Sequence, residues 1–261
     1  MNLGAISELF DNYGRTARLY PGVICLLPLL WHLPLLGSSS ALSVPEGLAA
    51  AAIGCALLYL VATIARHKGK VAEPRLIALW GGWPTTILLR HGDGRIDPMT
   101  KARYHGQLGR MANLVMPSAA EEQHDPAHAD AIYSSATKVL IESRRDESHS
   151  LLHKENAAYG FRRNLYGLRG AALCLAALLL TGTVGVFLLQ HDDLISLRSI
   201  LTGLAAQKLW TTAVFLDLAY LAFYAFVVTP EFVFQSGADY AAALLRTLDK
   251  SEPPSPVAAT P

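Results

Sequence analysis

A carboxylate near the centre of an apolar run is the first group in the sequence that could do chemistry. Asp217 lies within TTAVFLDLAYLAFYAFVV, residues 211–228, a run long and apolar enough to cross a membrane. Tyr220 and Tyr224 follow at i+3 and i+7, so a helix carries all three side chains on one stripe. An acid at mid-membrane costs about 2.5–3.5 kcal/mol on insertion scales, so it normally faces a partner or water.

Two interpretations of this acid remain open. No Lys, Arg or His other than His32 lies deep inside another apolar run, so Asp217 and His32 could form a buried pair. In a symmetric homo-oligomer, Asp217 would instead form a ring of carboxylates that lines a pore with Tyr220 and Tyr224 and attracts monovalent cations. The choice depends on whether this span faces its own bundle or the symmetry axis.

The run YGFRRNLYGLRG, residues 159–170, places guanidinium groups among aromatic rings directly before another apolar run. Arginine binds phosphate through paired hydrogen bonds, and aromatic rings stack on bases. The spacing therefore predicts a site for an anionic nucleotide or oligonucleotide. An interfacial anchor on lipid headgroups is the alternative. The predicted ligand-binding residues are Arg162, Arg163, Arg169, Tyr159 and Tyr166.

A third polar cluster, weaker than the other two, contains His91, Asp93, Asp97 and His105. Imidazole and carboxylate are the groups that a divalent metal or a general acid and base requires. However, the spacing matches no HExxH, Walker, Gly-x-Ser-x-Gly or zinc-knuckle motif, Asp97 before Pro98 is typical of a helix cap, and GDG is typical of a turn. We therefore expect no catalytic residue, no metal and no cofactor.

The elements that position these residues are expected to be helices in a membrane. Of 261 residues, 52% are hydrophobic and 16% are charged, which is typical of a membrane protein. Four runs approach the roughly 20 residues that cross a bilayer. They are residues 19–37, 47–65, 171–189 and 209–228.

Positive charge indicates the orientation of these spans. Segment 66–170 contains 16 Lys and Arg residues against 11 Asp and Glu residues, whereas the loop 38–46 contains no Lys or Arg. Because positive residues accumulate on the cytoplasmic side, both termini and segment 66–170 are expected there. The predicted fold is an all-α membrane protein with four transmembrane helices, N-in and C-in, and a mostly helical cytosolic insert.

Within the insert, Asp97-Pro98 and Asp125-Pro126 each predict a helix start, and a third helix is expected from about Ser150. Residues 74–96 contain the β-prone runs LIAL and TTILL, which could form a small hairpin. Alternatively, Trp80 and Trp83 could lie at the lipid interface. The expected organisation is an amphipathic segment 1–18, a transmembrane hairpin 19–65, the insert 66–170, a second hairpin 171–228, a C-terminal helix 229–250 and a disordered tail 251–261.

WGGWPTTILLRHGDGRIDPMTKARYH and ENAAYGFRRNLYGLRG, held between apolar hairpins, give the chain a resemblance to bacterial multi-span effector proteins of antiphage defence systems, as in the Hailong system. The resemblance implies a homo-oligomeric, ion-conducting pore in the bacterial inner membrane, gated by a nucleotide or oligonucleotide signal on the insert. It carries over no ligand residues.

Two other functions remain open at this point. A non-catalytic membrane anchor or scaffold would use the insert to recruit a cytosolic partner. A membrane-embedded, metal-dependent hydrolase would need His91, Asp93 or His105 to act. We expect a protein that is not an enzyme, whose partners are the lipid bilayer and further copies of itself.

Overall fold

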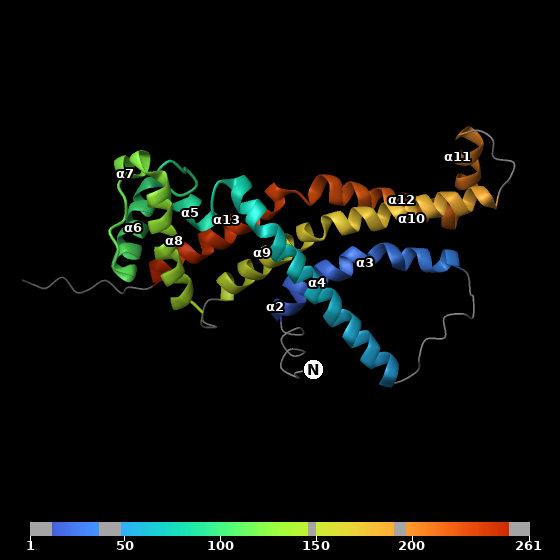
Figure 1. Ribbon diagram of the computed structural model, residues 1–261, viewed down its shortest axis with the longest axis horizontal. Helices are drawn as coiled ribbons and strands as arrows, with labels where there is room; N and C mark the ends of the chain where they lie inside the picture. Colours follow the sequence, from blue (N-terminus) through green and yellow to red (C-terminus); the bar gives the residue numbers. More distant parts are fainter. Residues whose placement is uncertain (1–11, 37–47, 146–149, 191–196, 251–261) are drawn as a thin grey trace, which may run out of the picture. The chain divides into compact units, whose positions relative to one another are not determined.

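The computed structural model describes residues 12–36, 48–145, 150–190 and 197–250, which form helices and the loops between them, with no strand among these residues (Figure 1). This confirms the all-helical class. The elements are α2 (Asn12–Gly14), η1 (Arg15–Leu19), α3 (Tyr20–His32), η2 (Leu33–Leu36), α4 (Leu48–Trp80), α5 (Pro84–Leu89), α6 (Pro98–Ala112), α7 (Ala119–His124), α8 (Pro126–Ser143), α9 (Ser150–Gly167), α10 (Arg169–Leu189), α11 (Leu197–Ala206), α12 (Lys208–Ala222), η3 (Phe223–Val227), α13 (Pro230–Arg246) and η4 (Leu248–Lys250).

Three helical stretches are long and apolar enough to cross a membrane: Arg15–Leu35, Arg169–Leu189 and Lys208–Val227. They correspond to three of the four expected spans. The remaining one, 47–65, begins outside the described residues and continues as the first half of α4, so it stays a prediction. Residues 1–11 of the expected amphipathic segment and the tail 251–261 also lie outside the described part.

The chain divides into two compact units. The first unit contains residues 1–72 and 160–232, and the second contains residues 73–159 and 233–261. The expected insert, 66–170, was bounded by the ends of apolar runs. The second unit takes a shorter part of this segment, residues 73–159, and it includes most of α13, which the sequence analysis assigns to a separate C-terminal segment.

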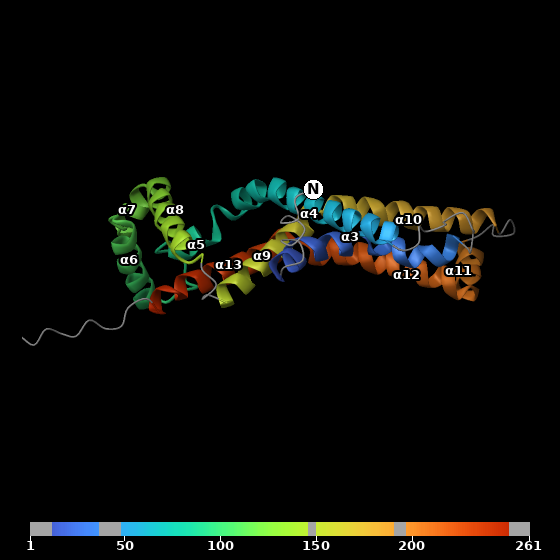
Figure 2. The same ribbon diagram turned by 90° about the horizontal axis from the view of Figure 1, so that it is seen from below.

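In the first unit, α3, α10 and α12 pack side by side, as both views show (Figures 1 and 2). Small residues allow this close approach, because lipid-embedded helices associate through packing rather than through a hydrophobic drive. The core of the first unit contains Cys25, Ala65, Leu165, Leu168, Ala172, Ala176, Tyr220, Tyr224 and Val228.

Helices α4 and α9 cross within the first unit at two glycines. A Cβ atom on Gly69 would collide with the side chain of Asn164, and one on Gly167 would collide with the backbone of Lys68 and Gly69. The Asn164 side chain is itself fixed, since its Nδ2 donates to the Ala17 carbonyl oxygen at 2.7 Å. The crossing therefore brings backbone against backbone and has no room for a larger residue.

The second unit is a helical bundle in which α5, α6, α7 and α13 surround α8 (Figure 1). Tyr133, Leu140, Leu108 and Leu244 lie fully buried at its centre. The two predicted helix starts are confirmed: Asp97 Oδ1 accepts from the Thr100 amide at 2.9 Å, and Asp125 Oδ1 accepts from the His128 amide at 3.0 Å. Each carboxylate satisfies an amide that the first helical turn leaves unpaired.

The hairpin alternative for residues 74–96 is wrong. LIAL lies inside α4, and TTILL forms most of α5. Pro84 occupies the first turn of α5, where its fixed φ suits a helix, and Ile87, Leu88 and Leu89 are then buried in the core of the second unit. Burial outweighs the β-propensity of Thr and Ile, which depends strongly on context.

The glycine crossing predicts a position-specific effect of alanine. Gly69→Ala should destabilise the protein by about 1–3 kcal/mol through overpacking. Gly54→Ala on the same helix should be neutral or slightly stabilising, because its Cβ meets nothing within 4 Å and alanine is the better helix former. Thermal unfolding of the two variants in detergent checks this, and equal melting temperatures would contradict the crossing.

Candidate functional site

The acid at residue 217 lies in a polar cluster inside the first unit, built by three helices. Trp31 and His32 come from the end of α3, Thr183 comes from α10, and Asp217 comes from α12. Asp217 is fully buried and His32 is 8% exposed. The chain by itself therefore contains the buried pair, which is one of the two interpretations of Asp217.

Each oxygen of the Asp217 carboxylate faces a different residue. Oδ1 accepts a hydrogen bond from Trp31 Nε1 at 3.0 Å, and Oδ2 lies 3.2 Å from His32 Nε2. The same His32 nitrogen lies 2.9 Å from Thr183 Oγ1. The sequence offered His32 as a partner in one of the two interpretations, but it did not predict Trp31 or Thr183, because no spacing links those residues to Asp217.

The second nitrogen of His32 determines how many protons the cluster holds. Nδ1 lies 2.7 Å from the Pro28 carbonyl oxygen, which can only accept, so Nδ1 carries a proton. With a neutral imidazole and an ionised Asp217, Nε2 and Oδ2 would be two acceptors facing each other at 3.2 Å. A further proton removes this conflict, either as an imidazolium–carboxylate pair or as a carboxylic acid donating to Nε2. In both forms the pair has no net charge.

Tyr220 has a structural role beside the cluster. Pro28 lies inside α3 and has no N–H, so it cannot pair with the carbonyl of Ile24 one turn earlier. The Tyr220 hydroxyl donates to that carbonyl at 3.2 Å and to the Cys25 carbonyl at 3.0 Å. Backbone groups need such partners in lipid, where water is absent.

The predicted pore-lining residues Asp217, Tyr220 and Tyr224 are all buried within the first unit. The rings of Tyr220 and Tyr224 contact each other, with their centroids 4.8 Å apart. The two tyrosines share one side of the helix as predicted, and in this chain they pack in the core of the first unit with residues of α3 and α10. A role in lining a pore stays a prediction.

The predicted ligand-binding residues divide between the two units. Tyr159 belongs to the second unit, where its hydroxyl donates to Glu73 Oε1 at 3.0 Å. Arg162, Arg163 and Tyr166 belong to the first unit, and Tyr166 packs beside its core. Arg162 donates to the Phe232 carbonyl at 3.0 Å, and its guanidinium carbon lies 4.5 Å from the centroid of the Phe232 ring. Arg163 lies 3.3 Å from Asn164 Oδ1.

Arg169 stabilises an interrupted helix end in the first unit. Pro230 has no N–H to offer the turn before it, where α12 widens into the π-helical η3. The Arg169 guanidinium donates to the Ala225 carbonyl in this turn at 3.0 Å. The role of Arg162, Arg163 and Arg169 in binding an anionic ligand stays a prediction, and in this structure all three contact oxygens of the chain itself.

The structure brings His91 and His105 together in the second unit but gives the two aspartates separate roles. The two imidazole rings meet edge to face, with centroids 4.9 Å apart. His91 Nε2 donates to the Pro117 carbonyl at 2.9 Å, and His105 Nε2 donates to the Leu89 carbonyl at 2.8 Å. Asp97 caps α6, and Asp93 accepts from the Arg95 amide at 3.0 Å. Among the described residues, nowhere do three or more His, Cys, Asp or Glu side chains lie together in a group that could hold a metal ion.

Two residues that the sequence did not predict complete this network. Glu122 accepts from the Tyr133 hydroxyl at 2.7 Å and from the His91 amide at 2.9 Å. Lys101 is 4% exposed, and its Nζ donates to the Arg90 carbonyl at 2.6 Å and to the Asp93 carbonyl. Burial lowers the pKa of Lys101, although the nearby Asp93 opposes the shift. The network connects the loop after α5 to α6, α7 and α8.

The intramembrane pair predicts non-additive mutations. His32→Ala leaves Asp217 without its proton-sharing partner, and loss of one member of a buried pair costs about 3–5 kcal/mol. The double variant His32→Ala/Asp217→Asn removes the uncompensated charge and should be more stable than His32→Ala alone. Thermal unfolding in detergent at about pH 8, where a free carboxylic acid is ionised, measures the difference. A double variant that melts at or below the single variant would contradict a coupled pair.

The second unit predicts a loss of stability in mild acid. Burial lowers the pKa of His105 below its ordinary value of 6.5, because burial disfavours the imidazolium, and the bond to Leu89 opposes this in part. Below about pH 6.5 the unfolded chain therefore binds a proton that folded His105 does not, and the free energy of unfolding falls as pH falls through this range. Melting temperatures between about pH 7.5 and 5 should fall less in His105→Gln than in the wild type. The exposed His124→Gln is the matched control and should behave as wild type.

The function is inferred from the two polar clusters, because comparisons with known proteins found no match. No protein-family model matches the chain, and no curated protein and no solved structure matches it.

Proposed function

We propose that the chain is a multi-pass membrane protein through which cations cross the membrane, and that the Asp217–His32 pair lies on their path. One observation carries this proposal: a fully buried carboxylate in a candidate membrane span lies 3.2 Å from an imidazole of another candidate span. Ionisable groups at this depth are expensive, and they mark ion and proton pathways in membrane proteins.

We infer that the described arrangement is the closed one. The pair has no net charge when it shares a proton, and Trp31 occupies the other carboxylate oxygen. A cation finds no free carboxylate in this arrangement. Separation of α3 from α12 would expose Asp217 and give a passing cation a ligand, and a proton would leave as the cation binds.

A homo-oligomer fits the surface of α10. Ala177 and Thr181 are exposed, and a Cβ atom on Gly182 or Gly185 would meet nothing within 4 Å. This face carries small residues at helical spacing, which suit close contact between lipid-embedded helices. Packing against α10 of another copy would cover it.

The remaining parts of the proposal follow from the sequence. The first half of α4 would be the fourth span, with both termini and the second unit in the cytoplasm of a bacterial cell. The excess of positive charge in segment 66–170 supports that side and an anionic nucleotide-like or oligonucleotide signal as the gating ligand. A role in antiphage defence rests on the resemblance of the chain to effector proteins.

A non-catalytic anchor or scaffold is the second candidate. The observation that favours it is the use of Arg162 and Arg169 for backbone carbonyls, which removes part of the predicted anion site from ligand binding. Such a protein would carry no current and would recruit a cytosolic partner through the second unit.

Ion flux through liposomes that contain the full chain distinguishes the two functions. With ribonucleoside monophosphates and short oligoribonucleotides as probes, we expect potassium flux well above that of protein-free liposomes. Asp217→Asn should lower the flux or its preference for cations, because it removes the charge that attracts them. His32→Gln should raise the flux measured without a probe, because it frees the carboxylate.

Asp239→Asn is the matched control, since this exposed acid lies on α13 in the second unit. It should leave the flux unchanged. A chain that carries no current with any probe would refute the pore and favour the anchor. A flux and a cation preference that are both the same in Asp217→Asn and in the wild type would refute the place of Asp217 on the path.

A further inference from the structure

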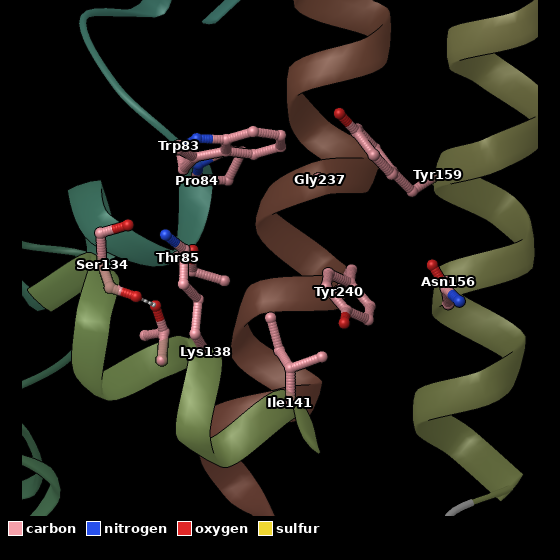
Figure 3. A pocket seen from close by; sticks show the side chains of 11 residues that line it. Trp83, Pro84, Thr85, Ser134, Lys138, Ile141, Asn156, Tyr159, Gly237 and Tyr240 are labelled. Atoms are coloured by element: carbon pink, nitrogen blue, oxygen red, sulfur yellow. Dashed lines mark hydrogen bonds between the residues drawn. The ribbon is translucent and has the colours of Figure 1, made fainter. Parts of the chain in front are cut away.

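A pocket of about 420 Å³ lies within the second unit, between α5, α8, α9 and α13 (Figure 3). Trp83 extends into it from the loop before α5 and Lys138 extends into it from α8, and Tyr159 and Tyr240 form the opposite side. Its volume falls in the range of about 300–1,000 Å³ that is typical of small-molecule sites. No residue of the clusters described above lines it except Tyr159.

The wall formed by α13 depends on a glycine. A Cβ atom on Gly237 would lie 2.9 Å from Pro84 Cγ and 3.3 Å from the Tyr159 ring, so only glycine allows α13 to pass between these residues. The Tyr159 ring is held in turn by the hydrogen bond from its hydroxyl to Glu73 at 3.0 Å. Proline and a tethered ring are rigid, so this side of the pocket is formed before any ligand arrives.

Aromatic side chains supply the surface that a planar molecule would contact. Trp83 is 44% exposed although it is one of the largest apolar side chains of the second unit. Tyr240 is half-buried on α13 and faces the same pocket. An indole and phenol rings favour stacked or edge-on contact with another ring.

The charge in the pocket comes from a lysine that pairs with no acid in the described part of the chain. Lys138 is the one charged side chain among the described residues that line the pocket, and it points from α8 toward Thr85 on α5 (Figure 3). The acids on α8 are already engaged: Asp130 pairs with Arg90 at 2.6 Å, and Glu142 pairs with Arg145 at 2.7 Å. Lys138 forms no ion pair with any described residue, so its ammonium group remains for a ligand.

We propose that this pocket binds a small, planar aromatic molecule that carries one anionic group. The ring lies against Trp83 and Tyr240, and the anionic group pairs with Lys138, while the side chains of Ser134 and Asn156 offer further hydrogen bonds. A nucleoside monophosphate and an aromatic carboxylate share this chemistry. The assignment of this molecule as the gating ligand rests on the proposed function, whereas its binding does not.

Calorimetric titration of the detergent-solubilised full chain tests the pocket. The probes are the four ribonucleoside 5′-monophosphates and indole-3-acetate, compared with the matched nucleosides, with tryptophol and with inorganic phosphate. We expect saturable binding of at least one ring-bearing anion below about 1 mM, with its uncharged or ringless counterparts weaker by about tenfold or more. Binding by nucleotides alone identifies a phosphate ligand, and binding by indole-3-acetate alone identifies a carboxylate.

Matched charge reversals locate the bound molecule. Lys138→Glu should weaken binding by about tenfold or more, whereas Lys154→Glu, an exposed lysine on α9 outside the pocket, should leave it unchanged. Trp83→Leu should weaken the binding of every ring-bearing probe, and unchanged melting temperatures show that the variants are folded. No saturable binding of any ring-bearing anion, or equal affinities in Lys138→Glu and Lys154→Glu, would overturn the proposal.

The two proposals can fail separately. Binding that depends on Lys138, in a chain that carries no current, refutes the pore and leaves the pocket in place. Potassium flux that is unaffected by Lys138→Glu, together with no binding in solution, refutes the pocket and leaves the pore.

Discussion

A buried carboxylate in a bundle of apolar helices must be neutralised where it lies, and the arrangement of the first unit follows from this constraint. Asp217 requires a proton-sharing partner, and His32 at the end of α3 lies 3.2 Å from its Oδ2 atom. Trp31 donates to the Oδ1 atom of Asp217, and Thr183 contacts His32. These contacts fix the depth of α3 against α12 and of α10 against both. A purely apolar interface would allow these helices to slide, since lipid-facing surfaces have little preference for one register. The proton that Asp217 and His32 share stabilises the interface, and its loss would change the charge of the interface.

Proline imposes the same requirement on the backbone. Pro28 leaves the Ile24 carbonyl without a helical partner, and Pro230 removes a donor from the turn that contains Ala225. A tyrosine hydroxyl from α12 satisfies the first break and an arginine at the start of α10 satisfies the second. Both donors come from a different helix, so each interruption in one helix becomes a contact between two. Pro28 and Pro230 are therefore part of how the helices of the first unit are held together.

The predictable parts of the fold were those with local causes. Asp-Pro pairs fix the starts of α6 and α8, because the cap and the ring act within one turn, and long apolar runs identify three candidate membrane spans by length and composition. The run TTILL was ambiguous from the sequence, because its helical form depends on burial in the core of the second unit. In the polar clusters, residue type gave a pair of Asp217 with His32 as one of two interpretations. Trp31, Thr183, Glu122 and Lys101 were not predictable, because they reach their partners from other helices and no spacing in the chain records those contacts.

The arginines of the run 159–170 have one further consequence, which follows from their bonds to the Phe232 and Ala225 carbonyls. An anion that recruits Arg169 must displace the Ala225 carbonyl, which has no helical donor in reserve before Pro230, because the Thr229 amide donates to Val227 instead. Binding of an anion by Arg169 and integrity of the η3 turn are thus competing states, coupled by thermodynamic linkage with equal strength in both directions. Such an anion would bind more weakly than it would bind guanidinium groups that have no carbonyl partner. The difference in binding free energy would be used to open the η3 turn at the end of α12.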